Sequence, residues 1–213
     1  ATLPLSHSLR HHMRIAGDPR HGHPASDPVQ SPRLYPFPPF MPNIRPSTDS
    51  DIPAITAIYQ HHVLHGTGTF EIDPPTEADM ATRRADVLAR GLPWLVAEKE
   101  GQILGFAYAN WFKPRPAYRF SAEDSIYVAD STRGMGVGRK LLAELALQAE
   151  AAGVRKLLAV IGDSANAGSI GLHRALGFTD VGTLRSMGWK FGAWRDIVLM
   201  EKTLGAGDTT SPE

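Results

Sequence analysis

The sequence predicts an α/β (α+β) fold in which helices flank a mixed, mostly antiparallel central sheet. Runs of β-branched and aromatic residues pair as hairpins near both ends of the folded region. Between these hairpins, strand-like runs alternate with segments whose apolar residues recur every three or four positions, which indicates a β-α-β-α-β crossover. A glycine-rich loop joins one of these strands directly to the next helix. Hairpins and a crossover together require antiparallel and parallel pairs in one sheet.

The composition is that of an ordinary globular protein. Of 213 residues, 42% are hydrophobic and 21% charged, and 22 basic residues balance 22 acidic ones. We therefore expect neither a nucleic-acid partner nor a membrane partner, and no apolar run reaches the roughly 18 residues of a membrane span. The chain has no cysteine, which excludes disulfides, thiolate metal sites and a cysteine nucleophile. Nothing requires an oxidising compartment, and we expect a cytoplasmic protein.

The chain divides into three segments by composition. Residues 1–40 hold eight of the 17 prolines and five of the nine histidines without a periodic apolar pattern. Such a segment cannot bury enough surface to offset its ordering entropy, so we predict a disordered N-terminal extension. Residues 41–204 form the predicted domain, which is long enough for one core. The polar residues 205–213 are predicted to be a flexible tail.

The elements of the domain follow in order. We expect a strand at 41–45, a helix capped by Ser47 or Thr48 that ends near His65, and a second helix at 77–90. Turn residues separate the remaining segments, which are strands at 93–98 and 102–112, a strand at 125–128, a helix from 139 to about 152, a strand at 154–161, a helix at 166–176, and a hairpin of 178–187 with 196–203 around a loop at 188–194.

The first helix carries a histidine pair, His61 and His65, at the i, i+4 spacing that can bind a metal. No carboxylate of the H-E-x-x-H type lies between them. We interpret these histidines as solvent-facing or packing residues and expect no metal.

The glycine-rich loop runs Arg133-Gly134-Met135-Gly136-Val137-Gly138 and opens a helix. The first N–H groups of a helix lack internal partners and carry partial positive charge, so phosphates bind at such ends. The G-x-G-x-G spacing fits neither a dinucleotide fingerprint nor a nucleoside triphosphate loop. Glycine-rich joints also occur for packing alone, and that alternative stays open from spacing alone.

Short motifs spread over residues 44–202 form a more specific set. They are Thr69-Phe70-Glu71 followed by Pro74-Pro75-Thr76, Pro93-Trp94-Leu95-Val96-Ala97-Glu98, Gly105-Phe106-Ala107-Tyr108-Ala109, Ala122-Glu123 ahead of Tyr127-Val128, Val160-Ile161-Gly162, and Lys190-Phe191-Gly192 ahead of Trp194. With the Arg-x-x-Gly-x-Gly loop, they resemble the GNAT superfamily of acyl-CoA-dependent N-acetyltransferases, in the branch of phosphinothricin and methionine sulfone or sulfoximine acetyltransferases. The resemblance implies a GNAT fold, acetyl-CoA as co-substrate, a small amino-acid-like amine as acceptor, and a homodimer.

The resemblance places the family's catalytic glutamate at Glu123, just ahead of the strand at 125–128. An ammonium group cannot attack a thioester, so such an enzyme needs a general base within direct or one-water reach. A surface glutamate on a strand would look the same from sequence alone. Its neighbour Asp124 points to the opposite face of a regular strand and is a weaker candidate. The resemblance also makes His173 a candidate general acid for the leaving thiolate; otherwise His173 packs beside the cofactor.

Further site residues follow from the same resemblance. The expected cofactor contacts are Ile126, Tyr127, Val128, Arg133, Gly134, Met135, Gly136, Val137, Gly138, Arg139, Asn166 and Ser169, and Asn166 is also a candidate helix N-cap. The expected acceptor contacts are Phe70, Glu71, Tyr118 and Arg119, with arginine suited to a carboxylate. Lys190, Phe191 and Trp194 either pack within their hairpin or lie near a partner's pocket. Two rival functions stay open, a protein lysine or N-terminal acetyltransferase and a non-catalytic coenzyme A sensor.

Overall fold

The computed structural model describes residues 42–212, and the predicted extension at 1–40 lies outside them. The strands of this part are β1 (Asn43–Pro46), β2 (Trp94–Lys99), β3 (Gln102–Trp111), β4 (Ser121–Val128), β5 (Lys156–Gly162), β6 (Thr179–Lys190) and β7 (Ala193–Thr203). The helices are α1 (Ile52–His65), α2 (Glu77–Ala89), α3 (Val137–Ala151) and α4 (Ala167–Ala175), with short 3-10 turns at Asp49–Asp51, Pro116–Tyr118 and Asp130–Thr132.

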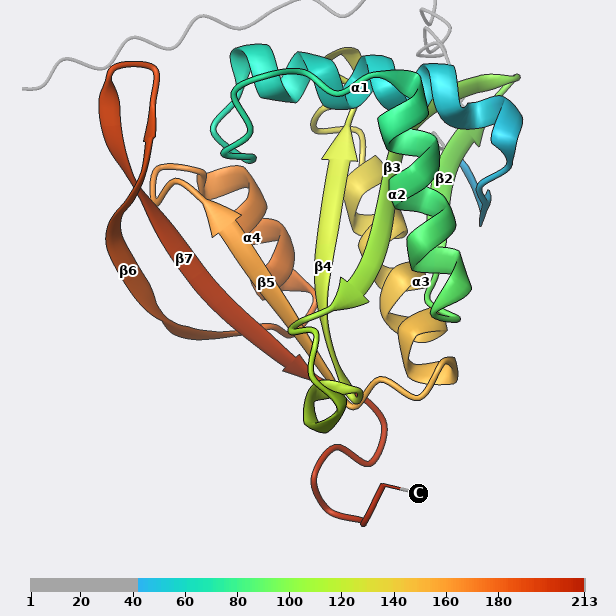
Figure 1. The fold of residues 1–213 in the computed structure, drawn as a ribbon, viewed down its shortest axis with the longest axis vertical. Coiled ribbons are helices and arrows are strands. Elements are labelled where there is room, and N and C mark those ends of the chain that lie inside the picture. Colours follow the sequence, from blue (N-terminus) through green and yellow to red (C-terminus); the bar gives the residue numbers. More distant parts are fainter. Residues whose placement is uncertain (1–41, 213) are drawn as a thin grey trace, which may run out of the picture. The chain divides into compact units, whose positions relative to one another are not determined.

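The seven strands form one mixed sheet in the order β1-β2-β3-β4-β5-β7-β6 (Figure 1). β4 and β5 pair in parallel, and the other neighbouring strands of the described residues pair antiparallel. The predicted mixed, mostly antiparallel sheet is thus confirmed. The parallel pair is the one that the crossover through α3 creates, as a parallel connection requires.

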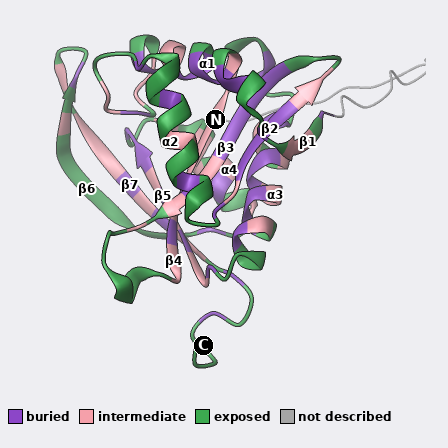
Figure 2. Ribbon diagram, turned by 45° about the vertical axis from the view of Figure 1, so that its right-hand side comes forward, coloured by how far each residue is buried: buried purple, intermediate pink, exposed green. Residues whose placement is uncertain are grey.

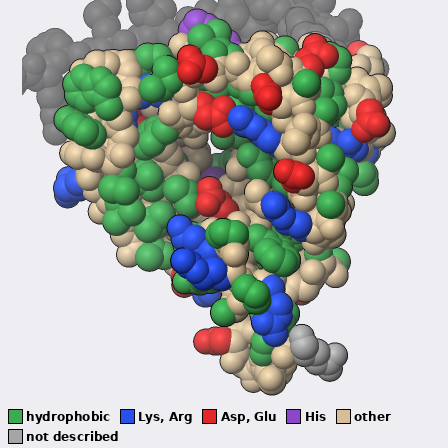
Figure 3. Space-filling model, viewed as in Figure 1, with side chains coloured by type: hydrophobic (Ala, Val, Ile, Leu, Met, Phe, Trp, Pro, Cys, Tyr) green, Lys and Arg blue, Asp and Glu red, His purple; other side chains and the backbone are tan. Residues whose placement is uncertain are grey.

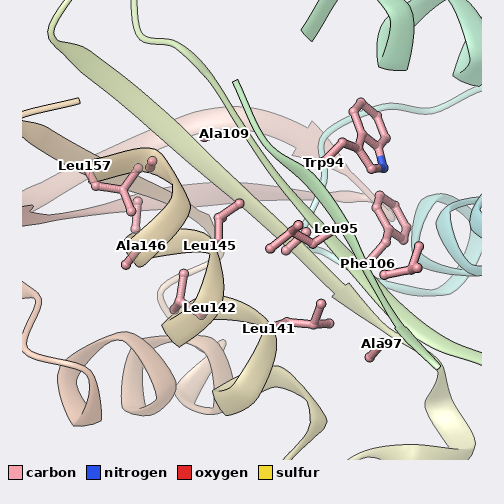
Figure 4. Packing of buried hydrophobic residues seen from close by; sticks show 14 of the residues in the cluster. Trp94, Leu95, Ala97, Phe106, Ala109, Leu141, Leu142, Leu145, Ala146 and Leu157 are labelled. Atoms are coloured by element: carbon pink, nitrogen blue, oxygen red, sulfur yellow. The ribbon is translucent and has the colours of Figure 1, made fainter. Parts of the chain in front are cut away.

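Helices cover both faces of the sheet (Figure 1). Leu141, Leu142 and Leu145 of α3 are fully buried and belong to one hydrophobic cluster with Leu95 of β2 (Figure 4). Phe106 lies on the opposite face, where its ring stands 6.4 Å from that of Tyr59 on α1. β2 and β3 are therefore buried on both faces over most of their length, whereas β4 is buried only at Ala122 and Asp124, on one face. A charged side chain on that buried face of β4 needs a partner.

β4 and β5 separate partway along their length (Figure 1). Their pairing runs from Ser121 with Lys156 to Asp124 with Ala159, and no register between the two described strands extends beyond it. On its other edge, β4 stays paired with β3 as far as Val128. The backbone groups of residues 125–128 that face β5 are consequently available to another partner.

The structure corrects three predicted boundaries. β4 begins at Ser121 and not at residue 125, so Glu123 lies inside the strand, where pairing with β3 and β5 overrides the weak strand propensity of its first residues. The helix predicted from residue 139 begins at Val137. The loop predicted at 188–194 contracts to Phe191-Gly192, both at positive φ, because the two strands keep pairing to the tip of the hairpin.

The end of the chain folds back toward the domain. The Arg155 guanidinium donates hydrogen bonds of 3.1 Å to the Gly207 carbonyl and 2.8 Å to Thr210 Oγ1. The flexible tail expected over 205–213 stays a prediction. Within residues 42–212, none of the helices has the length and apolar character needed to cross a membrane.

Candidate active site

A cleft of about 1160 Å³ opens where β4 and β5 separate. It is lined by the loop at residues 66–70, the free edge of β4, the glycine-rich loop and the first half of α4. Figure 3 shows the surface hollowed in the middle of this face. The separation of two sheet neighbours thus leaves a polar backbone edge at the wall of a large cavity.

The glycine-rich loop forms one end of the cleft. Gly134 and Gly136 have φ values of 76° and 81°, and a Cβ on either would have no atom within 4 Å. Glycine at these two positions therefore permits a left-handed backbone conformation and leaves the backbone accessible to a ligand. Gly136 is the N-cap of α3, whose first N–H groups have no internal acceptor. Gly138 differs, because a Cβ there would lie 3.3 Å from Leu172, so this glycine serves packing.

Positive charge accompanies these N–H groups. Arg133 and Arg139 line the cleft beside the N-terminus of α3. Arg133 also forms an exposed ion pair with Asp130, with 3.0 Å between Nε and Oδ1. Open glycine backbone, a helix N-terminus and two guanidinium groups together fit an anion such as a pyrophosphate.

Glu123 lines the middle of the cleft from β4. Burial raises the pKa of its carboxyl, the negative charge of Asp124 raises it further, and Lys113 opposes the shift. No residue of the described part of the chain donates a hydrogen bond to this carboxylate. A desolvated carboxylate without protein donors is a stronger base than one on the surface, because its charged form is less stabilised.

One side of the cleft is held by a network from α1 and α2. Tyr59 Oη lies 3.1 Å from Thr69 Oγ1 and donates to Glu71 Oε1 at 2.9 Å. Burial raises the pKa of Tyr59 to about 12, so it stays a neutral donor. Arg83 pairs with both oxygens of Glu71, at 2.7 and 3.2 Å. The Glu71 carboxylate is therefore already engaged inside the protein.

The other side of the same loop is held by the β6–β7 hairpin. Lys190 is buried, and its Nζ donates to the Thr69 carbonyl at 2.8 Å. Burial lowers the pKa of Lys190. The Phe70 ring packs directly over Gly188, where a Cβ would overlap it. The loop at 66–70 is thereby fixed over the cleft from both sides.

The first half of α4 completes the cleft. The Asn166 side chain accepts a hydrogen bond from the Ser169 backbone N–H at 3.2 Å, which confirms its N-cap role. His173 lies one turn below Ser169, with Nδ1 2.8 Å from the Ser169 carbonyl and Nε2 2.9 Å from Asp124 Oδ2. Burial lowers the pKa of His173, but the hydrogen bond and charge of Asp124 outweigh it and the net shift is upward.

The structure brings most of the predicted site residues together. Those that line the cleft are Phe70, Glu123, Ile126, Tyr127, Val128, Arg133, Gly134, Gly136, Val137, Gly138, Arg139, Asn166, Ser169 and His173. Met135, Glu71, Tyr118 and Arg119 do not line it. The Arg119 guanidinium stacks 4.3 Å from the Phe120 ring centre, beside a separate hollow of about 560 Å³.

Several lining residues were not expected from the sequence. His62 Nε2 donates to the Val128 carbonyl at 2.9 Å, and burial lowers the pKa of this histidine. His62 thus packs against the end of β4. Within residues 42–212, no cluster of three or more side chains that could ligate a metal ion is present. Tyr59 was missed as well, and Asp124 was considered only as a weaker candidate for the general base. A carboxylate that alternation turns toward the buried face of its strand is a signal for a paired, buried Asp124.

Comparison with known proteins decides the family. Residues 55–178 match the Acetyltransferase (GNAT) family. The chain belongs to this family. A phosphinothricin N-acetyltransferase from Alcaligenes faecalis is 54% identical to this GNAT chain over 80% of it and 86% of the relative. An L-methionine sulfoximine/L-methionine sulfone acetyltransferase from Pseudomonas paraeruginosa is 41% identical over 76% and 94%.

Solved structures agree with this assignment. A GNAT superfamily phosphinothricin acetyltransferase from Sinorhizobium meliloti, crystallised in complex with AcCoA, superposes with a TM-score of 0.79. It is 44% identical, and the match covers 81% of this chain and 93% of that one. The mixed sheet with helices on both faces is therefore the GNAT fold, as the motifs indicated.

Proposed function

We propose that this GNAT chain transfers an acetyl group from acetyl-CoA to the primary amine of a small amino-acid-like acceptor of the phosphinothricin, methionine sulfone or methionine sulfoximine type. The names of its relatives support this acceptor class. The observation that carries the mechanism is the position of Glu123, a desolvated carboxylate in the cleft where β4 leaves β5.

The cleft fits acetyl-CoA, which when bound supplies an activated acetyl thioester. The N–H groups that begin α3, with Arg133 and Arg139, would hold the pyrophosphate. The free edge of β4 at residues 125–128 offers N–H and C=O groups to the amides of the pantetheine arm, as an added strand would. These N–H groups could also stabilise the negative charge that develops on the acetyl carbonyl oxygen when the amine attacks.

Glu123 would act as the general base. It accepts a proton from the acceptor ammonium, directly or through one water, and so frees the nitrogen lone pair for attack. Burial and the charge of Asp124 raise the pKa of Glu123, which makes its carboxylate a stronger base than one on the surface. Of the four proposed acceptor contacts, Phe70 lines the cleft, while Glu71 acts through its bonds to Tyr59 and Arg83. A role for Tyr118 and Arg119 stays a prediction.

We also propose a homodimer that covers the β6–β7 hairpin, most of whose outer strand is exposed (Figure 2). Large apolar side chains crowd this hairpin at more than 40% exposure, namely Val181, Leu184, Met187, Trp189, Phe191 and Trp194. Contiguous exposed apolar side chains indicate an interface. Light scattering tests the proposal: Trp189→Glu should halve the mass of a wild-type dimer, and a monomeric wild type would refute it.

A thiol-release assay tests the proposed function. Acetyl-CoA is supplied with phosphinothricin, methionine sulfone, methionine sulfoximine, ordinary amino acids or lysine peptides, and the cysteine-free chain adds no thiol background. We expect release with the amino-acid analogues. Release with peptides alone would assign a protein acetyltransferase, and acetyl-CoA binding without any release would assign a sensor. A cytoplasmic location stays a prediction.

A further inference from the structure

We propose that Asp124 is a positioning residue of the acetyl-transfer site, because its buried ion pair with His173 fixes α4 against β4 across the cleft. The inference rests on the proposed function and deepens it. Asp124 and His173 come from elements that border the cleft on different sides, β4 and α4. An interaction that holds β4 and α4 together therefore sets the width of the cleft between them.

The contact is short and sealed from water. His173 Nε2 lies 2.9 Å from Asp124 Oδ2, and both side chains are only 2% exposed. Nδ1 lies 2.8 Å from the Ser169 carbonyl, which can only accept. Both ring nitrogens therefore face acceptors, so the ring binds as a doubly protonated imidazolium. The Phe178 ring packs against the imidazole from a third side, perpendicular to it and with 4.9 Å between the ring centres.

This geometry gives His173 a role other than that of a general acid. Each of its N–H groups is already donated within the protein, so transfer of either proton to a leaving thiolate would break a buried bond. Ser169 Oγ lies 3.4 Å from Nδ1, farther than the Ser169 carbonyl. The arrangement favours an imidazolium that positions the start of α4, where Asn166 and Ser169 line the cleft.

The ion pair with His173 engages only one of the two carboxylate oxygens of Asp124. Asp124 Oδ1 is buried and has no donor among residues 42–212, and Asp124 borders the cleft. A buried carboxylate oxygen without a protein donor is costly, so its retention beside the cleft calls for an explanation, which a positioning role supplies. The charge of Asp124 also acts on Glu123, its neighbour on the opposite face of β4.

The surroundings of His173 define its charge state. Asp124 faces it from β4, the Ser169 carbonyl and hydroxyl face it from α4, and Phe178 contributes an uncharged aromatic ring. Arg174, the next residue on α4, is exposed and pairs with Asp180 at 2.8 Å. Asp124 is thus the charged group that keeps the imidazole protonated, and replacing it should let the proton leave.

The experiment measures acetyl-CoA binding, KM and kcat for Asp124→Asn, Asp124→Leu, His173→Leu and the double leucine variant. Asparagine keeps the size and one acceptor but removes the charge, whereas leucine removes both. Asp51→Asn is the matched control, because Asp51 is another buried carboxylate, paired with Arg45 outside the cleft. The ring nitrogens of His173 are followed by ¹⁵N NMR as pH is raised.

We expect Asp124→Leu to weaken acetyl-CoA binding and raise its KM about tenfold, or 1.4 kcal/mol. His173→Leu should match it, and the double variant should be no worse than either single one, as for groups that act as a unit. In Asp124→Asn, which keeps the shape, the His173 ring should lose its second proton at a lower pH than in the wild type. Asp51→Asn should lose stability with KM unchanged.

Three results would overturn the inference. The first is unchanged acetyl-CoA binding and kinetics in a folded Asp124→Asn protein whose His173 has become neutral. The second is additivity of the effects of Asp124→Leu and His173→Leu in the double variant. The third is a loss of kcat that occurs in His173→Leu alone. The last result would assign His173 as the general acid. Failure of the wild type to bind acetyl-CoA would instead refute the proposed function, so the two failures are distinguishable.

Discussion

Replacing Glu123 with glutamine isolates its chemistry from its structural role. Glutamine has the same shape but cannot take a proton at neutral pH. The carboxylate accepts no hydrogen bond from the described residues, and burial disfavours its charge. We therefore expect the melting temperature to stay the same or rise slightly. Loss of a general base costs 10² to 10⁴-fold in kcat, or roughly 2.7 to 5.5 kcal/mol.

The assay follows thiol release at saturating acetyl-CoA with the best acceptor of the panel, and calorimetry measures acetyl-CoA binding separately. Glu201→Gln is the matched control, because Glu201 lies on β7 outside the cleft and forms a half-exposed pair with Lys156. Glu123→Gln should bind acetyl-CoA like the wild type with most turnover lost. Glu201→Gln should keep both acetyl-CoA binding and turnover at the wild-type level.

The pH profile gives a second readout of the same group. The base is active when ionised, so kcat/KM should rise with pH through the pKa of Glu123. Burial and Asp124 raise that pKa, which displaces this limb upward from the ordinary value of 4.5. Glu123→Gln should abolish the limb. Turnover within threefold of the wild type, with the limb retained, would remove Glu123 from the mechanism.

Three further predictions concern packing and stability. Gly188→Ala should raise KM for the acceptor, because the new Cβ would overlap the Phe70 ring at the cleft; unchanged acceptor kinetics would argue against Phe70 as a contact. Leu145→Ala should cost about 2 to 5 kcal/mol in urea unfolding, because Leu145 is fully buried against the sheet. Asp51 has its pKa lowered to about 2, mainly by its hydrogen bonds from Arg45. Its stabilisation of about 2 kcal/mol is present above pH 4 and lost as pH falls toward 2, so Asp51→Asn should remove that part of the acid dependence.

The sequence was informative wherever local chemistry decides the structure. The glycine-rich loop predicted a helix N-terminus open to an anion, and Gly134 and Gly136 adopt the positive φ that makes it so. The motifs indicated the fold and family because they sample six of the seven strands, β2 to β7, and the loop at 66–70. Glu123 was predicted as a site residue through its motif and lines the cleft, although its strand begins four residues earlier than propensity indicated.

What sequence reasoning missed depends on contacts between distant segments. Glu71 looked free to bind an acceptor, but Arg83 and Tyr59 engage it. Lys190 was expected to pack within its hairpin or to lie near a partner's pocket, whereas its Nζ donates to the Thr69 carbonyl, 121 positions away. Neither bond has a signal in local periodicity, because the partner arrives only when the hairpin packs on the cleft.

By itself, the sequence predicted the mixed sheet and the open glycine backbone at the N-terminus of α3, because hydrophobic periodicity and glycine placement act over a few residues, and its motifs indicated the family. Only the tertiary structure decided the partners of the charged side chains. Asp124 shows why: alternation along the strand correctly turned it away from Glu123, but the sequence did not show that this face is buried and that His173 of α4 reaches it. A buried carboxylate needs a partner, and the fold supplies His173 from 49 positions along the chain.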